Sequence, residues 1–137
     1  MKQISDWWYG SGRPERRGGA LMEVGRWGEK HAVRALRRKG HRILGRNVRI
    51  AGGELDVVTE APDGVTIVVV EVKAGKVWRG HRPADRVDRG KRKQLRRLGN
   101  ALRRAKRWQH RPMRWDVVAV EGQPGEKPTI VHHVGVV

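Results

Sequence analysis

The sequence predicts an α/β fold in which a central mixed β-sheet of about five strands is flanked by helices. Two runs rich in β-branched residues, 53–58 and 68–73, are separated by a short segment of turn composition, which is typical of two strands in a hairpin. Two longer segments, 21–39 and 84–108, repeat small or apolar residues every three or four positions, which is the period of a helix with one buried face.

The first helix is expected to end at Gly40, because glycine commonly terminates helices. Glu29 lies at the edge of the buried stripe, and the small residues of that stripe allow a close approach to the sheet. The helix is therefore expected to bring Glu29 towards the strands. The alternative is a surface carboxylate that pairs with nearby arginines. The stripe consists of Leu21, Gly25, Gly28, Ala32, Ala35 and Leu36.

Three further strands complete the expected sheet. Residues 41–50 are predicted to form an edge or entry strand that turns into the next strand at Ala51-Gly52-Gly53. Residues 113–120 and 127–134 follow a proline and are joined by a glycine-containing turn, which predicts two more strands. The second helix precedes them, and its buried seam is expected to consist of Val87, Lys91, Leu95, Leu98, Leu102 and Ala105.

The hairpin brings acidic side chains of two strands together. Its turn is predicted over residues 61–64, and the central pair of that turn places Asp56 opposite Val69 and diagonal to Glu71. Diagonal neighbours lie about 7 to 8 Å apart, which is within side-chain reach. Two carboxylates then converge on one point with Lys73 beside them. Carboxylate oxygens are the ligands that hard divalent cations such as Mg²⁺ prefer.

A less specific explanation of the Glu71-x-Lys73 triplet is an exposed strand end with a cross-strand ion pair. Three valines, at positions 68–70, directly precede Glu71. Their unbroken run indicates a strand that is covered on both faces, where an unpaired charge is costly. The valines therefore favour a functional site over an exposed ion pair.

Several short motifs together resemble the YraN family. That family is similar to Holliday-junction resolvases and, more broadly, to PD-(D/E)XK nucleases with the restriction-endonuclease-like fold. The match extends from about Leu21 to Val120. Its motifs are Gly25-x-x-Gly28-Glu29, Arg46-Asn47, Gly53-Glu54-Leu55-Asp56, Val70-Glu71-Val72-Lys73 and Lys91.

The resemblance implies a restriction-endonuclease-like fold and an endonuclease that hydrolyses DNA phosphodiester bonds, with branched or junction DNA as the suggested substrate. It implies that Asp56 and Glu71 bind Mg²⁺ or Mn²⁺, that Lys73 is the catalytic lysine and that Glu29 is an additional acidic catalytic residue. Lys73 could orient the attacking water or stabilise the charge that develops on the phosphate. The resolvase resemblance also favours a homodimer, because two strands need cutting.

The net charge points to a polyanionic partner, since 31 basic residues against 14 acidic residues give +17. Nucleic acid is the expected partner, because neutralised phosphates release condensed counterions. A membrane surface would call for a basic helix with a bulky apolar face, and we expect no membrane association. A third explanation is that high arginine usage reflects the composition of a whole proteome.

The basic charge is densest in the second predicted helix, where residues 84–108 contain 11 basic and two acidic residues. An exposed basic helix face can follow phosphates, and Lys91 on the buried side could approach the catalytic residues. The alternative is a solvated face that serves solubility. The candidate nucleic-acid-binding residues are Lys91, Arg92, Gln94, Arg96 and Arg103.

The loop over residues 75–83 directly follows the lysine strand, so Trp78 or His81 could stack on a base; the alternative is that Trp78 packs against the domain. Asp116 is expected to form a structural pair with an arginine. The neighbouring His132 and His133 point to opposite faces of a strand, so we do not expect them to bind one metal ion together.

The length of 137 residues suits one domain. We expect a flexible leader over residues 1–19 and a single nuclease-like domain over 20–137. The chain has no cysteine and no apolar run of about 18 residues, so a cytoplasmic protein is expected. The rival to the endonuclease is a non-catalytic nucleic-acid-binding protein that keeps the same fold.

Overall fold

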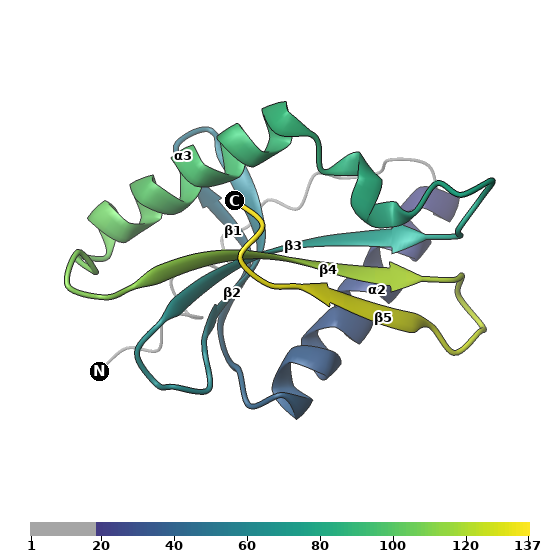
Figure 1. The fold of residues 1–137 in the computed structure, drawn as a ribbon, viewed down its shortest axis with the longest axis horizontal. Helices are drawn as coiled ribbons and strands as arrows, with labels where there is room; N and C mark the ends of the chain where they lie inside the picture. The colour runs from purple at the N-terminus through teal and green to yellow at the C-terminus, as the bar shows by residue number, and fades with distance from the viewer. Residues whose placement is uncertain (1–18) are drawn as a thin grey trace.

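A computed structural model describes residues 19–137 of the protein. Five strands form one sheet in the order β1-β2-β3-β4-β5; β3 and β4 are parallel and the other neighbours are antiparallel. The predicted α/β fold with a mixed sheet is therefore confirmed (Figure 1). The elements are α2 (Gly19–Arg38), β1 (Arg42–Ile50), β2 (Gly53–Glu60), β3 (Ile67–Gly75), the 3-10 helix η1 (Pro83–Arg86), α3 (Arg89–Ala105), β4 (Met113–Glu121) and β5 (Thr129–His133).

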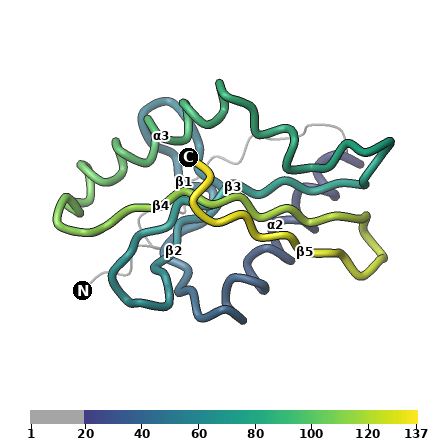
Figure 2. Tube along the Cα trace, viewed as in Figure 1, coloured from purple at the N-terminus to yellow at the C-terminus, as the bar shows by residue number. Residues whose placement is uncertain are grey.

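The two helices cover opposite faces of the sheet, as the ribbon and the Cα trace both show (Figures 1 and 2). On the α3 side, the buried core includes Ile67 and Val69 of β3. On the α2 side, it includes Val68 and Val70 of the same strand. The central strand is thus buried on both faces, as its run of valines predicts. The helix residues in these cores are Leu95, Leu98 and Leu102 of α3, and Ala32, Val33 and Leu36 of α2.

Helix α2 approaches the sheet most closely at Gly28. A Cβ atom added to Gly28 would lie 2.3 Å from the Cβ of Ala74, so only glycine allows this contact. The expectation that small residues bring α2 close to the sheet is therefore correct at Gly28. The predicted buried stripe is wrong at Leu21, which is 77% exposed, and at Gly25, whose added Cβ would meet nothing within 4 Å. The reason is that the later turns of α2, and not its first turns, pack on the sheet.

The register between β2 and β3 differs from the predicted register by two residues. Val58, and not Asp56, pairs with Val69. The connection is longer than predicted because the side chain of Asp63 accepts hydrogen bonds from the backbone N–H groups of Val65 and Thr66, both at 2.8 Å. Since side chains alternate with a period of two, a shift of two residues leaves the side chains of the paired residues, 57–60 and 67–70, on their expected faces.

Helix α3 begins later than predicted. The predicted start at Ala84 falls inside η1, and the helix proper starts after Asp88, whose carboxylate accepts a hydrogen bond from the backbone N–H of Lys91 at 2.8 Å. Asp88 is therefore an N-cap residue. Ala105, predicted to be buried, is exposed because it lies in the last turn of the helix.

The leader expected over residues 1–19 lies outside the described residues, except for Gly19, the first residue of α2. Between residues 19 and 137, no helix combines the length and the apolar character needed to cross a membrane. The remaining predicted strands, at both ends of the sheet, are present as β1, β4 and β5.

Candidate active site

The sheet opens at Asp56, where β2 and β3 separate. The pairing of the two strands runs as far as Val57 and Val70. Beyond this point the Oδ2 atom of Asp56 accepts a hydrogen bond from the backbone N–H of Val72 at 2.8 Å. The carboxylate thus takes the place of the carbonyl oxygen that a continuing strand would supply.

The regular alternation of side chains also breaks at Asp56. Leu55 and Val58 both belong to the core on the α3 side, although residues three apart in a regular strand face opposite sides. The break leaves Asp56 between the two faces. Glu29 of α2 and Lys91 of α3 both act electrostatically on its carboxyl group, so side chains from both layers reach one point.

Glu71 is the most deeply buried acid of this group, with a relative exposure of 3%. Its Oε1 atom lies 3.3 Å from the Nζ of Lys73 and 3.4 Å from the Nζ of Lys91. Its Oε2 atom is buried and has no hydrogen-bond partner among the described residues. A buried carboxylate oxygen without a donor is costly, and a bound cation would satisfy it.

Glu29 is held in place by β1. Its Oε1 atom accepts hydrogen bonds from Nε of Arg46 at 3.2 Å and from Nδ2 of Asn47 at 3.1 Å. Asn47 has a φ of 50°, a left-handed conformation that asparagine tolerates better than most residues. Glu29 therefore has the arginine partner considered from the sequence and also lies within electrostatic reach of Asp56. The contact of Asn47 was not foreseen, although the Arg46-Asn47 motif marked its position.

The environment raises the pKa of Asp56 to about 8. Burial is the largest cause, followed by the negative charge of Glu71, and Glu29 adds to the effect. The hydrogen bond from Val72 and the positive charge of Lys91 oppose the shift. The nearby lysines therefore do not offset the cost of ionising Asp56, and acidic groups with a raised pKa are concentrated at functional sites.

The donor set fits a hard divalent cation. Asp56 and Glu71 can offer carboxylate oxygens, and the Oε2 atom of Glu71 has no other partner in the described chain. Within residues 19–137 no group of three or more histidine, cysteine or acidic side chains is arranged to hold a metal ion. A magnesium site commonly uses one or two carboxylates, and water and substrate phosphate complete the coordination. Two carboxylates are therefore sufficient for Mg²⁺ or Mn²⁺.

Helix α3 carries an unbalanced positive charge next to this site. Among its basic residues, Lys91 alone forms an ion pair with a carboxylate in the described part of the chain. Three of the candidate nucleic-acid-binding residues, Arg92, Gln94 and Arg96, are exposed and therefore accessible to a ligand. The basic residues of α3 are Arg89, Lys91, Arg92, Lys93, Arg96, Arg97, Arg103 and Arg104.

Arg103 is placed differently from the other candidates. Its guanidinium donates hydrogen bonds to the backbone carbonyls of Trp108, Gln109 and Arg111, at 3.3, 3.1 and 2.9 Å. These bonds tie the end of α3 to the segment that leads into β4. The structure thus gives Arg103 a structural task away from the carboxylates.

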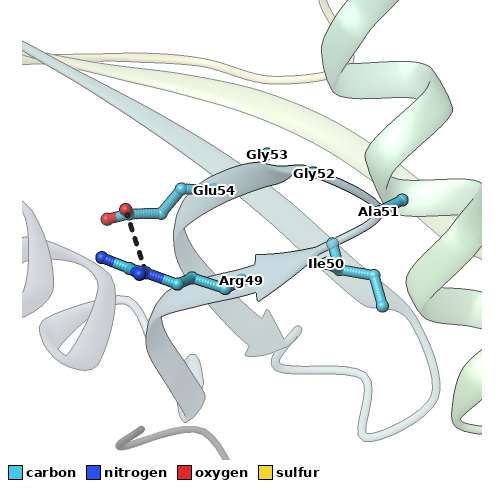
Figure 3. Close-up of a pocket in the computed structure, with 6 residues that line it drawn as sticks. All are labelled: Arg49, Ile50, Ala51, Gly52, Gly53 and Glu54. Carbon is cyan, nitrogen blue, oxygen red and sulfur yellow. Dashed lines mark ion pairs between the residues drawn. The ribbon is translucent and has the colours of Figure 1, made fainter. Parts of the chain in front are cut away.

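A surface hollow at the β1–β2 turn is lined by residues 49–54 (Figure 3), and none of the predicted catalytic residues is among them. The Nε of Arg49 lies 3.9 Å from the Oε2 of Glu54 there, and Arg97 of α3 donates a hydrogen bond to the carbonyl of Ala51 at 3.0 Å. The hollow contains one ion-paired acid and no second acid. It therefore lacks the carboxylate pair that the site at Asp56 has.

Asp116 forms the expected structural pair with an arginine. Arg114 donates two hydrogen bonds to it, both at 2.9 Å, and His132 and the backbone of Gly135 bind the same carboxylate at 2.7 and 3.0 Å. Burial alone would raise the pKa of Asp116, but these hydrogen bonds outweigh burial and lower the pKa to about 2. These contacts, all within the described part of the chain, are those of an ionised structural residue.

A five-stranded mixed sheet between two helices, with acidic and lysine side chains gathered where two strands separate, defines an α/β protein consistent with the restriction-endonuclease-like fold. The chain belongs to the Uncharacterised protein family UPF0102, whose model matches residues 28–120. This is the YraN family that the motifs predicted.

Relatives in several bacteria match most of the chain. A UPF0102 protein of Renibacterium salmoninarum is 37% identical over 111 residues, which cover 81% of this chain and 92% of the relative. One from Symbiobacterium thermophilum is 39% identical, covering 74% and 84%. One from Pseudomonas entomophila is 42% identical, covering 73% and 80%. Their names state the family and no activity.

Proposed function

We propose that the protein is a Mg²⁺- or Mn²⁺-dependent endonuclease that hydrolyses phosphodiester bonds of DNA. The observation that carries the proposal is the carboxylate pair of Asp56 and Glu71. One of its oxygens is buried without a donor in the described chain, and the pKa of Asp56 is strongly raised. A bound divalent cation would contact the unpartnered oxygen of Glu71 and would offset the cost of ionising Asp56.

Each residue of the site has a separate task in this proposal. Asp56 and Glu71 would hold the divalent ion, which when bound lowers the pKa of water and neutralises charge on the phosphate. The ammonium group of Lys73, 3.3 Å from Glu71, is positioned to donate a hydrogen bond to the attacking water or to a phosphate oxygen. Glu29 keeps Arg46 at the edge of the site.

The basic surface of α3 supports nucleic acid as the substrate. Exposed cations without carboxylate partners are free to bind phosphates, and the release of counterions would then drive binding. Arg92 and Arg96 are the exposed candidates in the part of the helix that follows Lys91. Lys91 itself contacts Glu71, so one helix would connect the phosphate-binding surface with the catalytic residues.

The resolvase resemblance extends the proposal to branched or junction DNA and to a homodimer that cuts two strands. The test is a cleavage panel of linear, flapped and four-way DNA with Mg²⁺ and with Mn²⁺. Asp56→Ala and Lys73→Ala should abolish cleavage while duplex binding remains. Glu126→Gln, in the exposed β4–β5 connection, is the control that should cleave normally.

The rival function is a nucleic-acid-binding protein without catalysis. It would be established if wild-type protein binds all three DNA forms but cleaves none of them with either metal ion. Cleavage by Asp56→Ala at the wild-type rate, in protein that has been separated from any contaminating nuclease, would contradict the assignment of the site.

A further inference from the structure

Trp78 differs from the other tryptophans that the structure describes, because it is 65% exposed. Trp27, Trp108 and Trp115 all pack against one of the two cores. Trp78 is also the only aromatic residue among the exposed large hydrophobic side chains of residues 19–137. A single exposed hydrophobic residue is ordinary in a protein surface, so its surroundings must decide whether it has a task.

The backbone presents Trp78 on a tight turn. The N–H of Trp78 donates to the carbonyl of His81 at 3.0 Å, and the N–H of His81 donates to the carbonyl of Trp78 at 2.8 Å. The two residues between them, Arg79 and Gly80, have φ angles of 47° and 79°, which is the pattern of a type I′ turn. The two backbone hydrogen bonds hold the turn in this conformation, although arginine adopts it at some cost.

The loop that carries this turn is tied to the body of the protein. Arg82 donates two hydrogen bonds to the buried carboxylate of Glu121, at 3.0 and 3.1 Å, and its backbone N–H donates to Asp85 at 2.7 Å. Arg86 donates to the carbonyl of Ala74, at the end of β3. An aromatic side chain on a loop that is already ordered loses little entropy when it binds a ligand.

The charge around Trp78 indicates the chemistry of that ligand. The guanidinium carbon of Arg79 lies 5.6 Å from the centroid of the Trp78 ring. Within the described chain, neither Arg79 nor Lys76 has a carboxylate partner. An exposed aromatic ring flanked by unpaired cations matches a nucleobase flanked by phosphates, because the ring stacks on the base and the cations bind the backbone.

The loop also lies close to the candidate active site in the chain. Trp78 is five residues after Lys73, so their Cα atoms are at most about 18 Å apart. Figure 1 shows that the loop projects beyond the ends of β3 and β4. A distance of about 18 Å corresponds to about five base steps along a strand. Bases within a duplex are already stacked on each other, so Trp78 can stack only on an unpaired or displaced base.

We infer that Trp78 stacks on an unpaired nucleobase within about five nucleotides of the phosphate that lies at Lys73. The substrate class is accordingly DNA with a single-stranded element beside the cleavage site, such as a flap or an open junction. This inference deepens the proposed function and rests on its nucleic-acid-binding part. It does not require the protein to cleave.

The test measures binding in the absence of cleavage, with EDTA present, for a linear duplex and for the same duplex carrying a single-stranded flap. Trp78→Ala should weaken binding of the flapped DNA by about 5- to 100-fold, as expected for the loss of one base stack, and should leave duplex binding unchanged. Trp78→Phe should retain most of the affinity. Val77→Ala, which shortens the exposed neighbouring side chain, is the matched control and should bind both DNAs normally.

A second readout reports the stack itself. The fluorescent base 2-aminopurine is placed at successive unpaired positions of the flap, and its emission should be quenched at one of them by wild-type protein and not by Trp78→Ala. Equal losses for duplex and flapped DNA, or no loss for either, would overturn the inference while the endonuclease proposal stands if cleavage still occurs. Selective loss of flap binding in a protein that never cleaves would keep the inference and reject the endonuclease.

Discussion

Replacing Asp56 by asparagine should make the protein more stable and inactive. The carboxyl group of Asp56 has a pKa of about 8 in the folded protein because it is buried beside Glu71. Asparagine removes the charge but keeps an oxygen that can accept the hydrogen bond from Val72. The substitution therefore relieves an unfavourable ionisation without breaking the contact that closes the gap between β2 and β3.

The size of the effect follows from the pKa. The ordinary value for Asp56 is 3.8 and the folded value is about 8. Because the folded value is raised, the folded protein binds one proton more than the unfolded chain between these values. The free energy of unfolding then falls by about 1.4 kcal/mol for each pH unit between about pH 5 and pH 7, and levels off above about pH 8. The full shift of about 4 units sets a ceiling of about 6 kcal/mol.

The assay is urea denaturation of wild-type protein and Asp56→Asn in EDTA, at about pH 5, pH 7 and pH 9. The stability advantage of Asp56→Asn should grow with pH, and Mg²⁺ should reduce it by binding to the folded wild-type protein alone. Asp63→Asn is a control of opposite sign, since hydrogen bonds from Thr66 and Val65 lower the pKa of Asp63 to about 2. Its stabilising contribution is present above about pH 4 and is lost as the pH falls towards 2, so Asp63→Asn should be less stable than wild type by the same amount at all three pH values. A pH-independent difference for Asp56→Asn, or a loss of stability at every pH, would refute the account of the site.

Four further substitutions, one of them a control, test the packing and the basic surface. Gly28→Ala should lower the melting temperature by about 4 to 10 °C in calorimetry, because its Cβ would collide with Ala74. The control Gly25→Ala should be neutral or slightly stabilising. Equal effects of the two substitutions would contradict the close approach of α2 to the sheet. Arg103→Ala should cost about 1 to 3 kcal/mol in urea denaturation, since it leaves backbone carbonyls without donors, and should leave the salt dependence of DNA binding unchanged. Arg96→Ala should leave the free energy of unfolding unchanged and should reduce the slope of log K against log salt concentration by about one in a DNA-binding titration. A loss of stability without a change of this slope would show that Arg96 is not part of the binding surface.

The sequence was sufficient for the class of fold and, outside the break at Asp56, for the faces of the strands, because β-branched runs and alternation depend on local composition. It was not sufficient for the register of β2 and β3. The length of their connection depends on the side chain of Asp63, which binds Val65 and Thr66, and the predicted turn stopped short of Thr66. The error of two residues did not separate Asp56 from Glu71, whose charge acts on the carboxyl group of Asp56 in the structure.

The start of α3 could have been predicted more accurately, because Asp88 is a typical N-cap residue. The task of Arg103 could not have been predicted. Charge and helical position describe Arg103 and Arg96 almost equally well. The difference between them comes from the backbone that follows α3, whose carbonyl oxygens reach Arg103 and not Arg96. Such a contact is a property of the assembled fold.

The separation of β2 and β3 explains why the acidic residues lie at this point of the sheet. When two strands part, the backbone N–H of Val72 loses the carbonyl partner that a continuing strand would supply, and Asp56 provides the replacement. The same gap allows α2 and α3 to contribute charges to one point from opposite faces, as Glu29 and Lys91 do. Partial burial in the gap then raises the pKa of Asp56, so the feature that positions the carboxylate also destabilises its charge. A bound cation would reverse that penalty, which is why the stability of Asp56→Asn and its response to Mg²⁺ test the geometry and the proposed chemistry together.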